Sequence, residues 1–311
     1  MLAVGSAGER ATCHSAVRGD PSDHKLLLAA RMRSFGQNHN PGGFGPQYAN
    51  DKELHMEVKD SKCVLAIGAH PDDLEILCAG TLALLRERGW KIACATMTPG
   101  DVGSATLSRE EISAIRRAEA AASARLLDAD YHCIGSDDIF MAYDRPTLVK
   151  VIALIRQLKP TIVFTMSPQD YMIDHEVTSD VVRTACFSAG IRNVPAHGTD
   201  PLSTIPYLFY SDPIDGKDKF GAEIKASTIV NISGTMQLKE KMFRCHESQA
   251  SWLKSHHGID DYVNASLKEL SAKRGVEIGA AFAEGFRQHL GHAFPQDNIL
   301  LEELTSLVHV A

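Results

Sequence analysis

Short apolar runs alternate with amphipathic segments along the chain downstream of Met56. The apolar runs are typical of strands buried on both faces and predict strands at Cys63–Ile67, Lys91–Met97, Tyr131–Ile134 and Thr161–Thr165. Helical periodicity predicts helices at Leu74–Arg88, after a capping box from Ser108 to Glu111, at Pro146–Leu158 and at Glu176–Ser188. This alternation predicts a mostly parallel sheet with helices on both faces, a three-layer Rossmann-like α/β fold.

The C-terminal third has a less regular pattern. Apolar runs predict strands at Pro206–Ser211 and Ile224–Ile232, and periodic segments predict helices at Gly234–Leu253 and Asp260–Phe286. The segment around Trp252 is expected either to cover a pocket or to join the core.

The N-terminal segment differs from the rest in composition. Met1–Lys52 mixes Gly, Ser, Asn, His and Arg without sustained periodicity, and the stretch NHNPGGFGPQYAN is rich in turn residues. We expect residues 1–55 to be a disordered extension, residues 56–311 to form the folded domain, and Met56 to be the functional start.

The first candidate site follows the strand predicted at Cys63–Ile67, where the sequence reads AHPDDLE. Pro71 prevents a helix from starting before the acidic pair, so His70, Asp72 and Asp73 are expected at the end of the strand. Open parallel sheets bind ligands at that edge. A histidine nitrogen and a carboxylate oxygen are a donor combination that zinc accepts in catalytic sites.

A second strand end carries a matching donor. The run Thr161–Thr165 is followed by SPQDYMIDH, which places His175 in the same strand-to-helix position as His70. Acidic residues at helix starts are common, so either site alone has an ordinary structural interpretation. Two such strand ends together favour a metal site with three protein ligands, His70, Asp73 and His175, and an open fourth position.

Several further motifs occur along the chain at Gly80-Thr81, Thr98–Asp101, Arg116–Glu119, Asp174-His175, Phe187–Arg192, His246–Gln249 and Ala283–Phe286. With AHPDDLE, they make the sequence between about Ser61 and Leu290 resemble the LmbE-like, or PIG-L-like, zinc-dependent N-deacetylases that act on N-acetylglucosaminyl compounds. The resemblance implies that residues 56–311 are an LmbE-like deacetylase domain that removes an N-acetyl group from an amino sugar or sugar conjugate by metal-activated water.

The resemblance also implies residue roles. His70, Asp73 and His175 would hold the metal, Asp72 would be the general base, and Arg116 would face the substrate. Exchange of the Asp72 and Asp73 roles stays open, because the two carboxylates are adjacent. Arg116 has the alternative of a surface ion pair with Glu119 three residues on.

Two further acids are assigned roles. Asp101 is expected to hydrogen-bond substrate hydroxyls, with an ordinary acidic turn residue as the alternative. Asp174 is placed behind the metal ligands, beside His175.

One position departs from the family pattern. Many members have His-Pro-Asp-His where this chain has Met172-Ile173-Asp174-His175, and the first histidine is implied to stabilise the oxyanion or relay a proton. A thioether can do neither. Either the zinc alone stabilises the oxyanion, another side chain replaces the histidine, or activity on the usual substrates is weak. The histidines considered as substitutes are His197, His246, His256, His257, His289 and His292.

Composition narrows the class of protein. A formal charge of −7 argues against a nucleic-acid-binding surface, and no apolar run is long enough for a membrane span. The seven cysteines are scattered without CxxC spacing and indicate a reducing compartment, so we expect a cytoplasmic protein. A homo-oligomer is compatible with the sequence.

Metal identity and substrate have alternatives. Iron(II) uses a similar set of two histidines and one carboxylate, so zinc is the first expectation and Fe²⁺ the second. Besides the deacetylase, two hypotheses stay open: a metal-dependent amidase acting on another small amide, and a catalytically inactive relative that binds a sugar or nucleotide.

Overall fold

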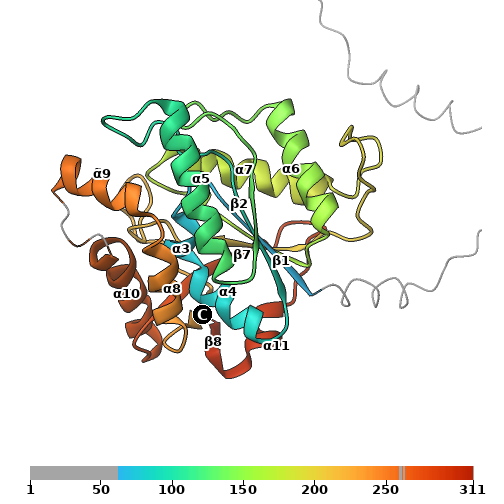
Figure 1. Ribbon diagram of the computed structural model, residues 1–311. Coiled ribbons are helices and arrows are strands. Elements are labelled where there is room, and N and C mark those ends of the chain that lie inside the picture. The colour runs from blue at the N-terminus through green and yellow to red at the C-terminus, as the bar shows by residue number, and fades with distance from the viewer. Residues whose placement is uncertain (1–61, 259–260, 262, 311) are drawn as a thin grey trace, which may run out of the picture. The chain divides into compact units, whose positions relative to one another are not determined.

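The computed structural model describes residues 62–258, 261 and 263–310 of the chain. The predicted extension, residues 1–55, and the proposed start at Met56 lie outside these residues. Within the described part, strands form an eight-stranded sheet in the order β3-β2-β1-β4-β5-β7-β6-β8 (Figure 1). No described helix is both long and apolar enough to cross a membrane.

Five strands form the parallel part of the sheet. They are β1 Cys63–Gly68, β2 Lys91–Thr96, β3 Asp130–Cys133, β4 Ile162–Thr165 and β5 Tyr207–Ser211. β1 is central, pairing in parallel with β2 on one side and with β4 on the other. The remaining strands are β6 Thr228–Asn231, β7 Ala283–Gln288 and β8 Val308–Val310, which join through antiparallel pairs. The predicted α/β class with a mostly parallel sheet is confirmed.

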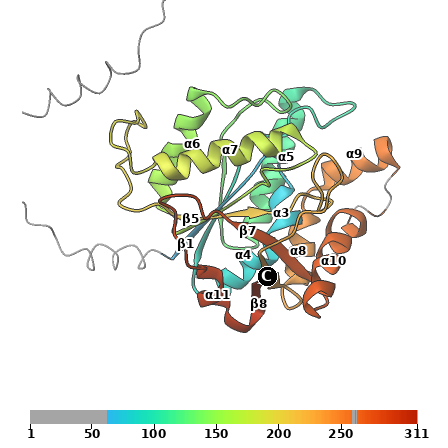
Figure 2. The same ribbon diagram turned by 180° about the vertical axis from the view of Figure 1, so that it is seen from behind.

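Helices cover both faces of this sheet. They are α3 Asp73–Leu77, α4 Ala79–Glu87, α5 Arg109–Arg125, α6 Arg145–Leu158, α7 Ile173–Ser188, α8 Met236–Phe243, α9 Glu247–His257, the π-helix η1 Asn264–Lys268, α10 Glu269–Ile278, α11 Ile299–Leu304 and the 3-10 turn η2 Thr305–Leu307. Figure 1 shows α4 and α5 over one face, and Figure 2 shows α6 and α7 over the other.

The alternation of side chains along β1 explains the two layers. Val64 and Ala66 belong to the hydrophobic core beneath α4 and α8, whereas Leu65 and Ile67 belong to the core beneath α6 and α7. Successive side chains of a strand point to opposite faces, so a strand buried on both sides needs a continuous apolar run. The CVLAIG sequence of β1 meets that requirement, and all six residues are buried.

The helix predicted at Leu74–Arg88 is wrong as a single helix, because it is divided at Cys78 into α3 and α4. Glu284 of β7 accepts hydrogen bonds from the backbone amides of Gly80 (2.9 Å) and Thr81 (2.7 Å) at the start of α4. A carboxylate at this position satisfies the free amides of a helix start and complements its dipole. The contact that stabilises the break therefore comes from a distant strand.

Two helix predictions in the C-terminal third also need correction. The one at Gly234–Leu253 is two helices, α8 and α9. The one at Asp260–Phe286 is wrong at its end, because Gly279 terminates α10 in the left-handed conformation (φ 69°) and the chain continues as β7. β7 inserts between β5 and β6, and this pairing with distant strands overrides the helical periodicity.

Candidate metal centre and active site

The carboxyl ends of β1 and β4 bring the two predicted donor segments together. The strands are adjacent and in register from Val64 opposite Ile162 to Ile67 opposite Thr165, so the loops that follow them share one edge of the sheet. His70, Asp73 and His175 are buried there, each with a ligand atom within 4.8 Å of the others. This group, here called the His-Asp cluster, is able to bind a metal ion.

Asp73 and His175 are oriented by neighbouring groups. Asp73 Oδ2 accepts hydrogen bonds from the backbone amides of Ala69 (2.9 Å) and His70 (2.7 Å), and its Oδ1 lies 3.5 Å from His175 Nε2. The other ring nitrogen of His175, Nδ1, lies 3.1 Å from Asp170 Oδ1. Nε2 is therefore the nitrogen of His175 that faces the cluster.

His70 is held by two acids on its outer side. Its Nε2 lies 3.1 Å from Asp138 Oδ1 and 3.2 Å from Asp174 Oδ2, while its Nδ1 lies 3.6 Å from Asp73 Oδ2. His70, Asp138 and Asp174 make a second group with metal-ligand spacing. Because two carboxylates occupy Nε2, Nδ1 is the His70 nitrogen directed toward Asp73 and His175.

The charges in the cluster shift its pKa values. Burial alone would lower the pKa of His70, but the carboxylates of Asp138, Asp174 and Asp73 raise it well above its usual value. Burial opposes the same change at His175, whose pKa is raised by Asp73 and Asp170. Burial would raise the pKa of Asp73, but the two histidines lower it. The metal-free cluster thus favours charged imidazoles beside charged carboxylates.

Asp72 lies in the same cavity and has an unusual backbone conformation. It is the residue before α3, with φ 109° and ψ −22°, and its side chain makes no capping hydrogen bond. A non-glycine residue at positive φ is strained, and such strain is concentrated at functional sites. Asp72 Oδ1 lies 3.5 Å from the Arg116 guanidinium, whereas Asp73 Oδ2 accepts from backbone amides, so the two adjacent carboxylates have different partners.

Arg116 reaches the cavity from α5. Its guanidinium donates to the carbonyls of Pro71 (2.7 Å) and Gly100 (3.3 Å), and it lies 3.5 Å from Asp72 Oδ1. Gly100 has φ 67°, and a Cβ there would overlap the guanidinium. Both its backbone conformation and its contact with Arg116 therefore require glycine. The alternative of an ion pair with Glu119 is wrong: Glu119 instead accepts hydrogen bonds from the backbone and hydroxyl of Ser248.

Asp101 does not line the cavity. Its Oδ2 accepts from Arg109 Nε (2.8 Å), and its Oδ1 accepts from the backbone amide of Asp138 (3.0 Å). The carboxylate thus positions the loop that carries Asp138. The expectation that Asp101 binds substrate hydroxyls stays a prediction.

The cavity over the His-Asp cluster has a volume of about 390 Å³. Its lining comprises His70, Asp72, Asp73, Ile76, Val102, Gly103, Arg116, Asp138, Ile139, Tyr171, Met172, His175, Ile214, Gln249, Trp252, Leu253 and Ser266. The segment around Trp252 therefore covers the pocket, one of the two outcomes expected for it. Apart from its buried acids, Arg116 and the two histidines, the wall is largely apolar.

Met172 lines this cavity. Among the candidate substitutes with described side chains, His197, His246, His289 and His292, none belongs to the lining. Asp174 Oδ1 is buried without a hydrogen-bond partner among the described residues. An acceptor without a donor two residues after Met172 is consistent with the histidine that is missing from the family pattern.

Sequence reasoning missed Asp138 and Asp170. Asp138 follows β3 at the same edge of the sheet, so the argument used for His70 and His175 applies to it as well. Asp170 lies within the segment already singled out, but its role depends on the direction of the His175 ring. Asp174 is placed behind the cluster, beside His70 rather than against His175.

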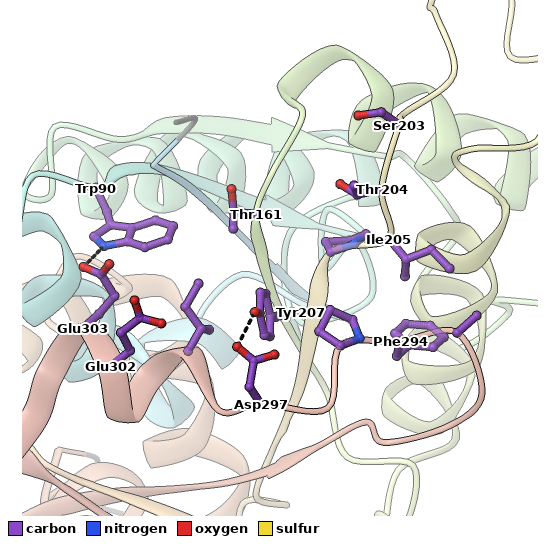
Figure 3. Close-up of a pocket in the computed structure, with 14 residues that line it drawn as sticks. Trp90, Thr161, Ser203, Thr204, Ile205, Tyr207, Phe294, Asp297, Glu302 and Glu303 are labelled. Carbon is purple, nitrogen blue, oxygen red and sulfur yellow. Dashed lines mark hydrogen bonds between the residues drawn. The ribbon is translucent and has the colours of Figure 1, made fainter. Parts of the chain in front are cut away.

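A larger cavity of about 660 Å³ lies at the opposite, amino edge of the sheet (Figure 3). Trp90 and Thr161 precede β2 and β4, and Tyr207 begins β5. Trp90 Nε1 donates to Glu303 (2.9 Å), and the Tyr207 hydroxyl donates to Asp297 (2.8 Å). The described residues that line it include no histidine or cysteine, so it offers no set of metal donors like the His-Asp cluster.

The fold and the site together define a class: a three-layer α/β enzyme with a buried group able to hold a metal ion at the carboxyl edge of its sheet. Residues 65–186 match the family model of PIG-L, described as GlcNAc-PI de-N-acetylase. This match bears out the predicted resemblance to the PIG-L, or LmbE-like, deacetylases.

Relatives extend this match. Diacetylchitobiose deacetylase of Thermococcus kodakarensis is 28% identical over 247 residues, covering 76% of this chain and 86% of that protein. The structure of N,N'-diacetylchitobiose deacetylase from Pyrococcus horikoshii has a TM-score of 0.63 and 26% identity, covering 84% of this chain and 100% of that one. The 4-oxalmesaconate hydratase of Pseudomonas putida is 26% identical, covering 76% and 90%. The predicted enzyme class, a hydrolytic N-deacetylase, is confirmed by the relatives named as deacetylases.

Proposed function

We propose that the protein is a zinc-dependent hydrolase that removes the acetyl group from an N-acetylated amino sugar or sugar conjugate. The observation that carries the proposal is the convergence of His70 Nδ1, Asp73 and His175 Nε2 at the base of the smaller cavity, beside the carboxylate of Asp72. The relatives named as chitobiose deacetylases support the choice of an acetylated amino sugar as substrate.

The donor set fits a catalytic zinc ion. Each imidazole has its outer nitrogen next to a carboxylate, Asp170 for His175 and both Asp138 and Asp174 for His70. Such carboxylates fix the ring and its tautomer, and leave the inner nitrogen as the metal ligand. Three ligands with one side open to a cavity are typical of catalytic zinc, although iron(II) accepts a similar set.

The chain's own residues then have distinct roles. A bound zinc ion would supply Lewis acidity and lower the pKa of water. Asp72 accepts the proton from the attacking water and returns it to the leaving amine, which is general acid–base chemistry by one carboxylate. Arg116 holds the loop around Asp72 through Pro71 and offers its guanidinium to the substrate. Breaking the amide bond yields acetate and a free amine.

A second candidate reaction follows from one relative. The 4-oxalmesaconate hydratase covers as much of this chain as the diacetylchitobiose deacetylase of T. kodakarensis and is almost as similar in sequence. Activation of water is common to both reactions, but in a hydratase the water adds to a carbon–carbon double bond and no acyl group leaves. The assay must therefore detect the products themselves.

Acetate and free amine are measured together after incubation with N-acetylglucosamine, N,N'-diacetylchitobiose and a panel of simple N-acetyl amides. We expect equimolar acetate and amine from the sugars, loss of both on chelation, and recovery with zinc. Acetate only from the simple amides would indicate the amidase alternative. Hydration of 4-oxalmesaconate without acetate release would indicate the hydratase. Stoichiometric metal with no turnover in any assay would indicate an inactive binding protein.

A further inference from the structure

Arg287 of β7 binds the loop between β4 and α7. Thr165, Tyr210 and Arg287 lie in one row across the adjacent strands β4, β5 and β7. From this row the guanidinium of Arg287 donates through Nη2 to Ser167 Oγ (2.7 Å) and through Nη1 to Gln169 Oε1 (2.8 Å). Both acceptors belong to the turn that follows β4. β7 therefore anchors a turn that precedes it in the sequence by 118 to 120 residues.

The turn that Arg287 binds is also closed by a hydroxyl. Ser167 is buried, and its Oγ donates to the carbonyl of Gln169 (2.6 Å) and accepts from the backbone amide of Gln169 (3.1 Å). With the bond from Arg287, this hydroxyl uses its one donor and both of its acceptor positions. The guanidinium and the hydroxyl together give the turn from Ser167 to Gln169 a defined shape.

The next residue of the chain, Asp170, contacts the His-Asp cluster. It is buried, and its Oδ1 lies 3.1 Å from His175 Nδ1 and accepts from the backbone amide of Met172 (3.1 Å). A carboxylate in this position fixes the orientation and the tautomer of the imidazole. Arg287 thus holds the turn that immediately precedes the group orienting His175.

The hydrogen bonds of Arg287 go to neutral groups in the described part of the chain. Asp212 is the acid whose charge acts on Arg287, but its carboxylate is bonded to Arg274, with Nε 2.6 Å from Oδ2. Burial lowers the pKa of Arg287, and its Nε is buried with no hydrogen-bond partner among the described residues. A desolvated cation without a bonded carboxylate is costly, so stability alone does not explain an arginine here.

Arg156 of α6 anchors a different loop in a similar way. It is buried and donates to the carbonyls of Ala189 (2.9 Å), Ile191 (2.6 Å) and Val194 (3.4 Å), which follow α7. These three residues do not line the smaller cavity. Of the two anchored loops, the one held by Arg287 continues into the His-Asp cluster. Arg156 is therefore a matched control for the anchoring of a loop by an arginine.

We propose that Arg287 is a positioning residue of the proposed metal site. It holds the Ser167–Gln169 turn, and this turn keeps Asp170 against His175 Nδ1. The Nε2 atom of His175 then stays directed toward the metal. The inference rests on the proposed function and adds a residue to it. Arg287 does not line the smaller cavity, so it acts on zinc affinity and kcat and not on the binding of substrate.

The zinc dissociation constant of the full chain and the melting temperature of its metal-free form test this role. We expect Arg287→Met to weaken zinc binding about tenfold, as for other groups that orient metal ligands, and to lower kcat without changing KM. Arg287→Lys should have a smaller effect, because a single ammonium lacks the planar fork that donates to two acceptors. Arg156→Lys should lower the melting temperature and leave zinc affinity unchanged. Unchanged zinc affinity in Arg287→Met would overturn the proposal.

Gln169→Ala provides a second variant in case Arg287→Met does not fold. Gln169 is exposed, and its loss removes one of the two acceptors while Arg287 remains. Zinc binding should weaken in this variant, by less than in Arg287→Met. A zinc affinity equal to that of the wild type would count against the proposal in the same way.

A double-mutant cycle shows whether Arg287 acts through Asp170. Asp170→Ala removes the carboxylate beside His175, so Arg287→Met should change zinc affinity by less than about twofold in that background. A tenfold effect that persists without Asp170 would contradict the positioning role.

Zinc affinity is measured without substrate, so failure of this inference is distinguishable from failure of the proposed function. Zinc binding that depends on Arg287, in a protein that releases no acetate from any substrate, would support the positioning role and refute the deacetylase. Acetate release together with a zinc affinity that does not depend on Arg287 would refute the positioning role and leave the proposed function standing.

Discussion

The two cavities of this protein lie at opposite ends of the same strands, and they differ in how their charged groups are placed. The larger one, of about 660 Å³, carries acids such as Asp297 and Glu302 that are exposed. The smaller one, of about 390 Å³, carries His70, Asp73 and His175, all buried. Cavity volume alone would indicate the larger cavity as the active site, whereas the buried charged groups indicate the smaller one.

The physical basis of this difference is the cost of desolvation. A charged side chain removed from water is strongly destabilising unless it is paired, hydrogen-bonded or coordinated to a metal. Several such groups around one small cavity are therefore hard to explain by stability alone. They lie at the carboxyl edge of the parallel strands, where α/β proteins bind their ligands. The concentration of buried donors at that edge, rather than cavity volume, therefore marks the candidate active site.

The largest expected effect tests which cavity is the active site. His70→Ala, Asp73→Ala and His175→Ala should each lose bound zinc and bring deacetylase activity to background, because two remaining ligands are too few to hold the ion. Glu303→Gln in the larger cavity and the exposed His197→Ala should keep both. Metal content is measured by elemental analysis beside acetate release.

Full zinc occupancy in any of the three purified cluster variants would remove that residue from the ligand set. Loss of activity in Glu303→Gln with the fold intact would reverse the comparison of the two cavities.

A smaller effect separates chemistry from metal binding. Asp72→Asn should retain zinc but lose roughly 10²- to 10⁴-fold in kcat, because the amide cannot accept a proton from water. Asparagine also tolerates positive φ, so the backbone at φ 109° is preserved. Zinc content and kcat are measured on the same sample. If Asp72→Asn loses zinc while Asp73→Asn keeps it, the roles of the two carboxylates are exchanged.

The next effect concerns the departure from the family pattern. Met172→His should raise turnover of N-acetylglucosamine by up to about 10²-fold, the scale on which a single donor to developing charge contributes. Asp174 Oδ1, which has no hydrogen-bond partner in the described part of the chain, is available to orient the new imidazole. Zinc content should not change. An unaltered or lower kcat on this polar substrate would show that position 172 does not limit the chemistry.

The smallest effect is a pH dependence of zinc binding. In the metal-free protein the pKa values of His70 and His175 are raised by neighbouring carboxylates, so zinc has to displace protons. Affinity should fall as pH drops through these raised values, by about tenfold per pH unit for each proton displaced. The raised histidine pKa values also stabilise the metal-free fold below the unfolded value, and this stabilisation is lost as pH rises through the folded value.

The increase in melting temperature on adding zinc should therefore grow from about pH 6 to about pH 8. Thermal denaturation with and without zinc, together with competition against a chelator of known affinity, measures this change. A zinc affinity that is flat across the range would contradict raised histidine pKa values in the metal-free cluster.

Much of the parallel sheet could be predicted from the sequence, because strands such as Cys63–Gly68 are buried on both faces and so carry a continuous apolar run. β7 could not be predicted, since its sequence AEGFRQ has no strand periodicity. This segment is extended because it pairs with β5 and β6. The break between α3 and α4 depends in the same way on Glu284, which is distant in the sequence. Tertiary contacts decide these elements.

The candidate site was also only partly predictable from the sequence. The proximity of His70 and His175 could be predicted, because each directly follows a recognisable strand and parallel strands end at one edge of the sheet. The contacts of Asp101 could not be predicted, because they depend on Arg109 and on the loop of Asp138, which folds back onto Asp101. Residue type and strand position predict the donors that face the metal, whereas the groups that orient them depend on side-chain directions that only the structure gives.

Anomalous diffraction at the zinc absorption edge, from crystals grown with one equivalent of zinc, locates the bound metal. We expect a single peak bonded to His70 Nδ1, Asp73 and His175 Nε2, open toward the smaller cavity. A peak on the other side of His70, between Asp138 and Asp174, or no peak in this cavity at all, would contradict it.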